Sequence, residues 1–253
     1  MSTLAVIPAR LGATRLPRKP LLLLGGAPLI VRVWERVIAM QAADHVVVAT
    51  DVEEIAAVVR AAGGDAVLTS DAHISGTDRV AEVALQPQFA RFEVIVNVQG
   101  DEPWLTGAAV RGAAEQVTSG RFPLGTAAAA ATAEILSEPS VVKVVTDDTG
   151  RALYFSRAPI PYLRDASDAA TQAPLIFQHL GVYAYTRDAL ARWVALPPHP
   201  LELVERLEQL RAVAAGMPMG VAPVPPVHGG GIDTPEDLAR ANARWSDPIA
   251  TAL

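Results

Sequence analysis

Short apolar runs that alternate with helical patterns restrict the fold of this chain more than any other feature of its sequence. Four runs of strand length, rich in β-branched residues, cover residues 4–8, 45–50, 66–68 and 94–98. Between them, apolar residues recur at helical spacing after Pro28, and further helices are expected over residues 53–62 and 77–85. Strands and helices in this alternation predict an α/β fold with a parallel sheet and right-handed crossovers.

The pattern changes in the second half of the chain, where strands follow one another with little helix between them. After a helix over residues 106–118, we expect neighbouring strands over residues 125–132, 141–146 and 152–156, and a loop over residues 158–174. The remaining elements are expected to be a strand over residues 180–185, helices over 187–195 and 203–215, a strand over 219–222 and a helix over 234–245. We therefore expect a single domain over residues 1–253, with a β-rich arm inserted near residues 125–175.

Composition excludes several classes of protein. The 253 residues carry a net charge of −6, which argues against general nucleic-acid binding, since that requires clustered positive charge. There is no cysteine, so disulfides and thiol chemistry are excluded, and a cytoplasmic location is expected. No signal peptide is visible, and the apolar stretch over residues 20–33 is interrupted and too short to cross a bilayer, so no membrane insertion is expected.

The first strand leads directly into a loop with four fixed positive charges, which are Arg10, Arg15, Arg18 and Lys19. No acidic residue precedes Glu35, so nothing near the loop in sequence neutralises it. Cations beyond the carboxyl end of a buried strand are well placed to bind phosphates. The alternative is a solvated surface loop with scattered basic residues.

The same loop carries a recognisable motif. The pattern Pro8-Ala9-Arg10-x-x-x-Thr14-Arg15-Leu16-Pro17-x-Lys19-Pro20-Leu21 resembles the opening of the sugar-acid cytidylyltransferases, above all those that act on 3-deoxy-manno-octulosonate (Kdo), the CMP-Kdo synthetases. The family usually has serine where this chain has Ala13. The resemblance implies that Pro8, Ala9, Arg10, Arg15 and Lys19 bind the nucleotide, which would be CTP.

A first candidate metal ligand follows the fourth strand, in the segment Gln99-Gly100-Asp101-Glu102-Pro103. A carboxylate at the end of a parallel strand points into the ligand crevice, and glycine lets a ligand approach the backbone. The structural alternative is that Asp101 caps the next helix. The segment matches the family, which supports Asp101 as a Mg²⁺ ligand and Gln99 and Gly100 as nucleotide contacts, with Gln99 also near the sugar.

A second candidate carboxylate lies near the end of the chain, in His228-Gly229-Gly230-Gly231-Ile232-Asp233 followed by Thr234-Pro235-Glu236-Asp237-Leu238. Thr234 with Asp237 three residues later is a strong helix-start signal. The resemblance implies that Asp233 is the second Mg²⁺ ligand. Only the fold can bring Asp233 beside Asp101, so their proximity is a prediction.

The remaining binding residues are implied mainly by the resemblance. Ser75 and Gly76 match a segment that lies against the cytosine and ribose, although Ser75 or Thr77 can also be a plain helix cap. The sugar acid is expected to contact Arg79, Gln99, Arg157, His179, Tyr183, Glu208 and Gln209. Alternatively, His179 and Tyr183 are core residues whose polar atoms are satisfied inside the protein. Glu208 and Gln209 can also belong to a solvated helix face, opposite a buried face formed by Leu203, Leu207 and Leu210.

Together these motifs imply a Rossmann-like, three-layer nucleotidyltransferase with a mostly parallel central sheet and a smaller β-rich dimerisation arm. The implied reaction joins CTP and Kdo to give CMP-Kdo and pyrophosphate, for lipopolysaccharide synthesis, with Mg²⁺ as cofactor and a homodimer as the assembly. Arg10, Arg15, Lys19, Asp101 and Asp233 are the expected catalytic residues. The alternatives are a cytidylyltransferase for 8-amino-Kdo or a sialic acid, a glycosyltransferase of similar architecture, and a catalytically silent nucleotide-binding module.

Overall fold

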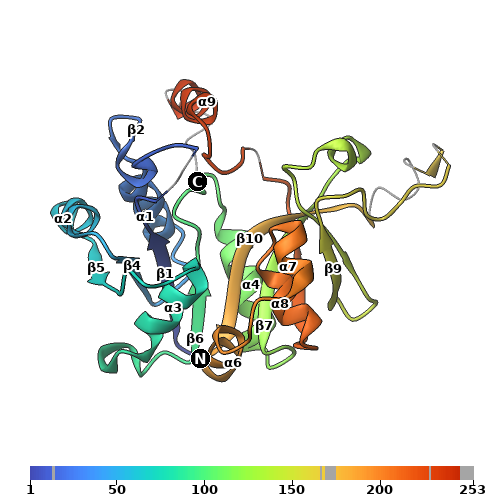
Figure 1. The fold of residues 1–253 in the computed structure, drawn as a ribbon, viewed down its shortest axis with the longest axis horizontal. Helices are drawn as coiled ribbons and strands as arrows, with labels where there is room; N and C mark the ends of the chain where they lie inside the picture. Colours follow the sequence, from blue (N-terminus) through green and yellow to red (C-terminus); the bar gives the residue numbers. More distant parts are fainter. Residues whose placement is uncertain (13–14, 166, 169–174, 228, 246–253) are drawn as a thin grey trace. The chain divides into compact units, whose positions relative to one another are not determined.

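The chain divides into two compact units, shown in Figure 1. The structure is a computed structural model that describes residues 1–12, 15–165, 167–168, 175–227 and 229–245. Unit 1 consists of residues 1–107 and 227–253, and unit 2 of residues 108–226. Unit 1 therefore joins the two ends of the chain, and unit 2 contains the region predicted as the β-rich arm.

Unit 1 is built on a parallel sheet in the order β6–β1–β4–β5. Its strands are β1 (Thr3–Ala9), β4 (His45–Thr50), β5 (Asp65–Leu68) and β6 (Val94–Asn97). The central strand is an unbroken apolar run because it is covered on both faces, and its residues Leu4 to Ile7 are completely buried. The predicted parallel sheet is confirmed in this unit.

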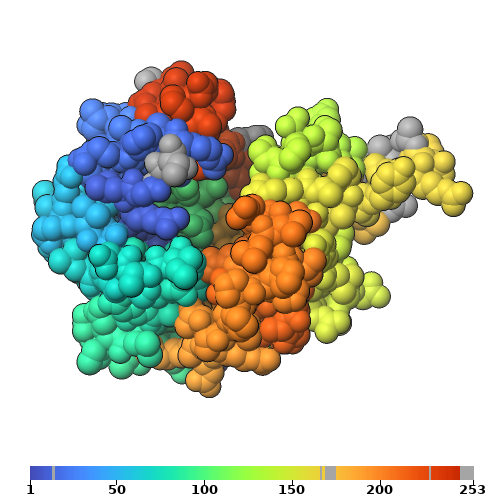
Figure 2. Space-filling view, viewed as in Figure 1, coloured from blue at the N-terminus to red at the C-terminus, as the bar shows by residue number. Residues whose placement is uncertain are grey.

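The helices of unit 1 begin and end close to the predicted residues. They are α1 (Leu29–Ala39), α2 (Glu53–Ala61), α3 (Gly76–Leu85) and α9 (Pro235–Trp245), with short 3₁₀ turns over Lys19–Leu21 and Pro87–Phe89. Pro28 lies at the N-cap of α1 and not inside it, because it belongs to a small hairpin of β2 (Leu23–Leu24) and β3 (Ala27–Pro28) that sequence reasoning missed. Figure 2 shows α9, in red, against the blue residues of this hairpin, where Asn242 hydrogen-bonds the Leu23 carbonyl.

Unit 2 contains mixed strand pairings. Its strands are β7 (Leu124–Ala130), β8 (Lys143–Thr146), β9 (Ala152–Ser156), β10 (Phe177–Thr186) and β11 (Met219–Val224). β10 is antiparallel to β7 and β8, β8 is antiparallel to β9, and β11 is parallel to β7. Within residues 125–156 the antiparallel pairing is that of β8 with β9, whereas β7 pairs with the later strands β10 and β11. β10 begins three residues earlier than predicted.

One prediction for unit 2 is wrong. The single helix expected over residues 203–215 is two short helices, α7 (Pro200–Glu205) and α8 (Gln209–Ala214). Arg206 lies between them with φ 56°, a left-handed conformation that an α-helix cannot continue through. Leu203 is consequently 52% exposed and does not share a buried face with Leu207 and Leu210.

The other helices of unit 2 are α4 (Gly107–Thr118), whose first residue is the last of unit 1, and α6 (Arg187–Val194), and a 3₁₀ turn covers Ala133–Ser137. Part of the loop predicted over residues 158–174 lies outside the described residues, as do Ala13, Thr14 and His228 of the sequence motifs. Among the helices in the described ranges, none has the length and apolar character needed to cross a membrane.

Candidate active site

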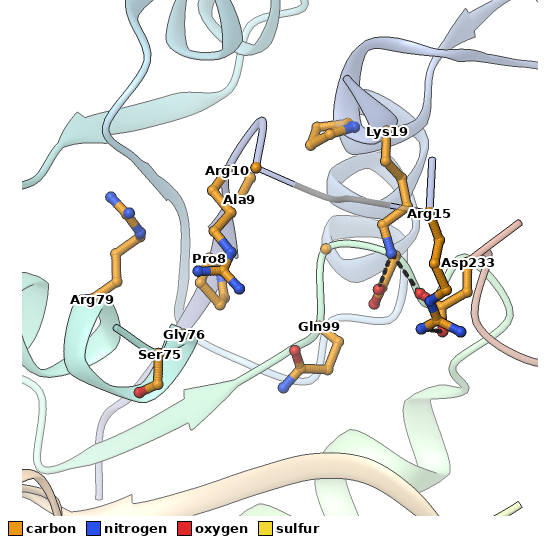
Figure 3. A pocket seen from close by; sticks show the side chains of 14 residues that line it. Pro8, Ala9, Arg10, Arg15, Lys19, Ser75, Gly76, Arg79, Gln99 and Asp233 are labelled. Atoms are coloured by element: carbon orange, nitrogen blue, oxygen red, sulfur yellow. Dashed lines mark hydrogen bonds and ion pairs between the residues drawn. The ribbon is translucent and has the colours of Figure 1, made fainter. Parts of the chain in front are cut away.

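A cavity of about 340 Å³ opens in unit 1 where β1 and β6 end. Every residue predicted to bind the nucleotide or the metal lines it, and Figure 3 shows how their side chains converge. The lining consists of Pro8, Ala9, Arg10, Gly12, Arg15, Lys19, Pro20, Ser75, Gly76, Arg79, Gln99, Gly100, Asp101 and Asp233. The structure therefore brings four distant segments of the sequence to one site.

Lys19 connects the two candidate metal ligands. Its Nζ lies 2.5 Å from Asp101 Oδ2 and 2.9 Å from Asp233 Oδ1, and its side chain is only 13% exposed. Burial by itself lowers the pKa of Lys19, but the carboxylates of Asp101 and Asp233 outweigh it and hold that pKa above its ordinary value. The ammonium group is therefore charged and fixed between two carboxylates.

The other cations of the opening loop also have partners that sequence proximity did not reveal. Arg15 donates to Asp233 Oδ2 at 2.9 Å, while Arg18 pairs with Glu54 outside the cavity. The exposed Arg10 makes a long contact of 3.4 Å to the Ile74 carbonyl. Because Arg15 is 68% exposed, it can turn toward a bound anion at little cost.

Asp101 is not a helix cap, so the alternative explanation for a carboxylate at this position is wrong. The next helix, α4, begins only at Gly107. The preceding Gly100 is required for steric reasons, since a Cβ there would lie 2.8 Å from the Pro8 carbonyl oxygen. Close approach of these two backbones places Asp101 beside the cation loop that follows β1.

Asp233 is held by the start of α9. Its N–H and that of Thr234 both donate to Asp237 Oδ2, at 3.1 and 2.9 Å, and Asp237 N–H donates back to Thr234 Oγ1 at 3.1 Å. The helix start predicted from Thr234 and Asp237 is confirmed. This cap fixes the Asp233 backbone and leaves its carboxylate to face Lys19 and Arg15.

Glu102 is a charged group of the site that sequence reasoning did not single out. Burial, together with the nearby Asp101 and Asp233 carboxylates, raises the pKa of Glu102 to about 8, and Lys19 partly opposes the shift. Its place next to Asp101 was visible in the sequence, but its crowding by Asp233 was not. A proton on Glu102 limits the negative charge that gathers around Lys19.

The carboxylate pair fits a Mg²⁺ ion that shares its coordination with phosphates. The Lys19 ammonium already shows that one cation can contact both aspartates. Within the described ranges, no three His, Cys, Asp or Glu side chains form a cluster that could hold a metal alone. Magnesium commonly takes one or two protein carboxylates and completes its shell with phosphate oxygens and water, so Asp101 and Asp233 suffice.

Ser75 and Gly76 form another part of the cavity wall. The Ser75 hydroxyl accepts from Asp78 N–H at 3.2 Å, so Ser75 is the N-cap of α3, the alternative that its sequence position allowed. A Cβ at Gly76 would lie 3.3 Å from Pro8 Cγ, which keeps this turn close to β1. Capping and lining are compatible, because the cap uses the serine side chain and leaves the Gly76 backbone beside the cavity.

Arg79 is placed differently from the expectation that it faces the sugar acid. It is 3% exposed, and its guanidinium lies 3.3 Å from Asp51 Oδ1 and hydrogen-bonds Thr69 Oγ1 and the Ser70 carbonyl. Figure 3 shows the group pointing away from Gln99. Arg79 therefore anchors the loop before Ser75 through its Nη1 and Nη2 groups, while it also lines the cavity.

The other predicted sugar contacts belong to unit 2, where His179 is a satisfied core residue. Thr126 Oγ1 donates to the Val182 carbonyl at 2.6 Å and lies 2.9 Å from His179 Nε2, which must therefore carry the proton. Burial lowers the pKa of His179 to about 3. Neutral His179 supports the ring of Tyr183, whose centroid lies 5.3 Å away.

Tyr183 and Glu208 lie near each other in unit 2, and Gln209 follows Glu208 in the chain. Burial raises the pKa of Tyr183 well above its ordinary value, with Tyr185 and Glu208 adding to the shift. Gln209 is 3% exposed, so the alternative of a solvated helix face is wrong for this residue.

Arg157 is held by backbone carbonyls. It donates to the carbonyls of Glu205 and Pro139, each at 3.0 Å, and its own N–H donates to Glu205 Oε2 at 2.9 Å. The guanidinium is therefore oriented by its own unit.

Known proteins resemble this chain over most of its length. The model of the cytidylyltransferase family matches residues 4–219. The curated 3-deoxy-manno-octulosonate cytidylyltransferase of Gemmatimonas aurantiaca is 60% identical over 245 residues, which cover 97% of this chain and 95% of that protein. The resemblance drawn from the sequence motifs is thereby confirmed.

Solved structures extend the comparison to the fold. A CMP:2-keto-3-deoxy-manno-octonic acid synthetase, solved in complex with CTP, is 39% identical, with a TM-score of 0.87 and coverage of 96% of this chain and 98% of that one. The inositol-1-phosphate CTP transferase of T. maritima is 12% identical with a TM-score of 0.64, covering 97% and 96%, and shows the fold alone. The predicted α/β nucleotidyltransferase fold is confirmed, and the chain belongs to the cytidylyltransferase family.

Proposed function

We propose that this chain transfers the CMP group of CTP to 3-deoxy-manno-octulosonate, giving CMP-Kdo and pyrophosphate. The observation that carries the proposal is the convergence of Lys19 and Arg15 with Asp101 and Asp233 around one cavity. The chain is also 60% identical, over nearly its whole length, to a protein that bears this name. Cations and paired carboxylates in one cavity are the groups that nucleotidyl transfer from a triphosphate requires.

The cationic side chains bind the triphosphate and stabilise the charge that develops on the departing pyrophosphate. Arg15 and Arg10 offer planar donors to phosphate oxygens, and Lys19 provides a compact charge at the centre of the cavity. Lys19 and Arg15 already lie in the cavity, paired with the two aspartates, so only a local turn of each side chain is needed to reach the phosphates.

Asp101 and Asp233 are the proposed ligands of Mg²⁺. When bound, the ion supplies charge neutralisation for the phosphates and lowers the pKa of the attacking sugar hydroxyl. With Asp101 and Asp233 holding the ion, the Lys19 ammonium would be available to pair with the phosphates. The two roles are compatible because Lys19 is anchored in a short 3₁₀ turn while its Nζ lies on a flexible stem.

The sugar acid is proposed to contact Tyr183, Glu208, Gln209, Arg157 and Gln99, which together supply hydroxyl, carboxylate, amide and guanidinium groups. The amide of Gln99 lines the cavity, and Tyr183 and Glu208 are close enough to influence each other's charge. A polyhydroxylated acid needs this mixture of donors and acceptors. His179 supports Tyr183, and Arg79 supports the loop before Ser75; neither is assigned a substrate contact.

Pyrophosphate release tests the proposed function directly. Purified protein is incubated with each of the four nucleoside triphosphates, with Kdo, 8-amino-Kdo or a sialic acid, and with or without Mg²⁺. We expect turnover with CTP and Kdo in the presence of Mg²⁺ only. Faster release with another sugar acid would reassign the substrate, and CTP binding without any release would identify a silent nucleotide-binding module. A parallel incubation with a nucleotide sugar, followed by nucleotide release, tests the remaining alternative: turnover there without turnover of CTP would indicate a glycosyltransferase.

A homodimer formed through the predicted arm, residues 125–175, is the proposed assembly, and a cytoplasmic location, where CTP is made, is proposed with it. Large apolar side chains are exposed in this segment, namely Tyr162 at 81%, Leu175 at 54% and Leu153 at 51%. Sedimentation of the wild-type protein is expected to show a dimer, and Tyr162→Asp is expected to shift it toward monomer. A wild-type protein that sediments only as monomer would exclude this assembly.

A further inference from the structure

The two segments that carry the site's aspartates are joined directly by their backbones. Ile232 N–H donates to the Asp101 carbonyl at 3.0 Å, so the residue before Asp233 is attached to Asp101 itself. The Ile232 side chain is 1% exposed and anchors this segment in the interior of unit 1. The separation of the two carboxylates therefore depends on one short backbone connection.

A side chain at the neighbouring Gly231 would crowd the Glu102 carboxyl group, which would have to shift. A Cβ at this position would be 2.8 Å from Glu102 Oε1, 3.4 Å from Glu102 Cδ and 3.8 Å from the Asp101 carbonyl oxygen. The φ of Gly231 lies outside the positive range, so the requirement is steric and not conformational. Glycine at this position thus leaves room for the Glu102 side chain, next in sequence to Asp101, against the segment that leads into Asp233.

Trp104 holds the same segment from its other side. A Cβ at Gly229 would lie 2.7 Å from the Trp104 ring, and the Arg244 guanidinium of α9 lies 4.1 Å from the centroid of that ring. The Trp245 ring centroid is 5.4 Å from that of Trp104. One residue, three positions after Asp101, therefore contacts both the glycine segment before Asp233 and the end of the helix after it.

The far end of α9 adds a second attachment to the β2–β3 hairpin. Asn242 Oδ1 accepts from Gly25 N–H at 2.9 Å, and a Cβ at Gly25 would lie 2.0 Å from Trp245 Cδ1. Ala241 is the buried residue of this helix, so apolar burial contributes little to its docking. The helix that carries the Asp233 cap is therefore located by a few specific contacts, among which those of Trp104 lie nearest the carboxylates.

We propose that Gly231 and Trp104 are positioning residues that set the separation of Asp101 and Asp233, and through it the affinity of the site for a metal–nucleotide complex. Neither residue lines the cavity, so neither is assigned a contact with substrate. The proposal rests on the proposed function in one respect, which is that the two aspartates bind a divalent cation together with CTP.

Gly231→Ala tests the proposal, with Gly230→Ala as its matched control. A Cβ at Gly230 would meet nothing within 4 Å, so the control makes the same chemical change one residue away without the steric conflict. The readout is the affinity for Mg²⁺ or Mn²⁺ in the presence of CTP, measured by isothermal titration calorimetry. We expect Gly231→Ala to weaken metal–CTP binding about tenfold or more and to lower kcat by roughly 10–100-fold, because small misplacements of reacting groups are costly. KM for the sugar acid is expected to stay unchanged. Gly230→Ala is expected to keep the metal–CTP affinity and the kcat of the wild type.

The outcomes separate the proposal from the function on which it draws. Wild-type metal affinity in Gly231→Ala, or an equal loss in Gly230→Ala, would overturn the positioning role. Weakened metal–CTP binding in Gly231→Ala alone, in a protein that releases no pyrophosphate with any sugar acid, would support positioning while rejecting the proposed reaction. If Gly231→Ala does not fold, Trp104→Phe provides the test. Phenylalanine keeps an aromatic ring, but its smaller size reduces the contact with Gly229 and Arg244. Unaltered metal–CTP affinity in that variant would likewise overturn the proposal.

Discussion

The Nζ of Lys19 lies 2.9 Å from Oδ1 of Asp233, although the two residues are 214 positions apart in the sequence. The same Nζ lies 2.5 Å from Asp101. A cation that bridges two carboxylates in the free protein prevents their mutual repulsion and keeps both oriented toward the cavity. In the proposed reaction, the same geometry would make Lys19 the cation best placed to pair with a triphosphate once the two aspartates held a metal ion.

Replacement of Lys19 by alanine is expected to slow the chemical step more than it weakens substrate binding. Loss of one preorganised positive group at a developing charge typically lowers kcat by roughly 10²–10³-fold, and we expect a change of that size. Pyrophosphate release at saturating CTP and Kdo measures it. Normal turnover in Lys19→Ala would show that this ammonium does not contact the reacting phosphates.

Arg18→Ala is the control for loss of a positive charge from the same loop. Arg18 is 54% exposed, pairs with Glu54 and does not line the cavity. An exposed pair of this kind contributes little, so we expect turnover within about twofold of the wild type. Equal losses in both variants would indicate that the charge of the loop as a whole matters, and not the position of Lys19.

The sequence allowed the membership of this site to be predicted, but not its internal pairing. The cations after β1 and Asp101 after β6 were predictable because the ends of parallel strands meet at one edge of a sheet. Their pairing with Asp233 was not, because it depends on where α9 docks at the end of the chain. Arg79 shows the limit most clearly: its position near Ser75 favoured a substrate contact, whereas its actual partner, Asp51, lies at the end of another strand.

Arg79→Met is expected to destabilise the protein. It removes the partner of a largely buried carboxylate, since Asp51 is 20% exposed and Arg79 is 3% exposed. Breaking one side of a buried ion pair typically costs about 3–5 kcal/mol. Urea denaturation measures the loss, and KM for CTP is expected to rise because the loop at Thr69 and Ser70 loses its anchor.

The double variant Arg79→Met with Asp51→Asn separates the charge effect from lost packing. Removing the charge of the abandoned carboxylate is expected to restore part of the stability, since the remaining amide is cheaper to bury than an ion. A double variant as unstable as Arg79→Met alone would mean that Arg79 acts through packing and its hydrogen bonds to the loop.

Acid sensitivity is expected from His179. Burial lowers its folded-state pKa to about 3, below the ordinary value of 6.5, so the unfolded chain binds a proton that the folded chain does not. No stability is lost above pH 6.5, and below it the free energy of unfolding falls by about 1.4 kcal/mol per pH unit until the folded-state pKa is reached. Urea denaturation between pH 8 and pH 4 measures the slope.

His179→Gln provides the comparison for that slope, because glutamine can still donate to Thr126 but does not titrate. We expect the variant to be less stable than the wild type at pH 8, where only packing changes, and the difference to shrink as the pH falls. Parallel pH profiles for the two proteins would contradict a buried, neutral His179.

The secondary structure was predictable where the apolar periodicity was strong. The prediction failed where the backbone of a single residue interrupts a helix. Residues 203–215 have apolar residues at helical spacing, which favoured one helix. Arg206 breaks it, and nothing in its residue type announces a left-handed conformation, for which glycine or asparagine is the usual signal. The break lets Leu207 and Gln209 turn inward while Leu203 stays exposed. Because the break could not be predicted, the burial of Gln209 could not be predicted either.

Arg206→Gly is expected to stabilise the protein for the same reason. Arg206 has φ 56° and ends α7 with its N–H donating to the Glu202 carbonyl, a role that glycine fills without the steric penalty of a Cβ. The left-handed conformation costs an ordinary residue roughly 1–2 kcal/mol, and the added freedom of glycine in the unfolded chain offsets part of the relief. We expect a net gain of about 0.5–1 kcal/mol in urea denaturation, whereas Arg206→Ala, which keeps the Cβ, should gain nothing. Equal stability of the two variants would show that the backbone at Arg206 is not strained, and the break between α7 and α8 would then have to arise from the packing of Leu207 and Leu210 alone.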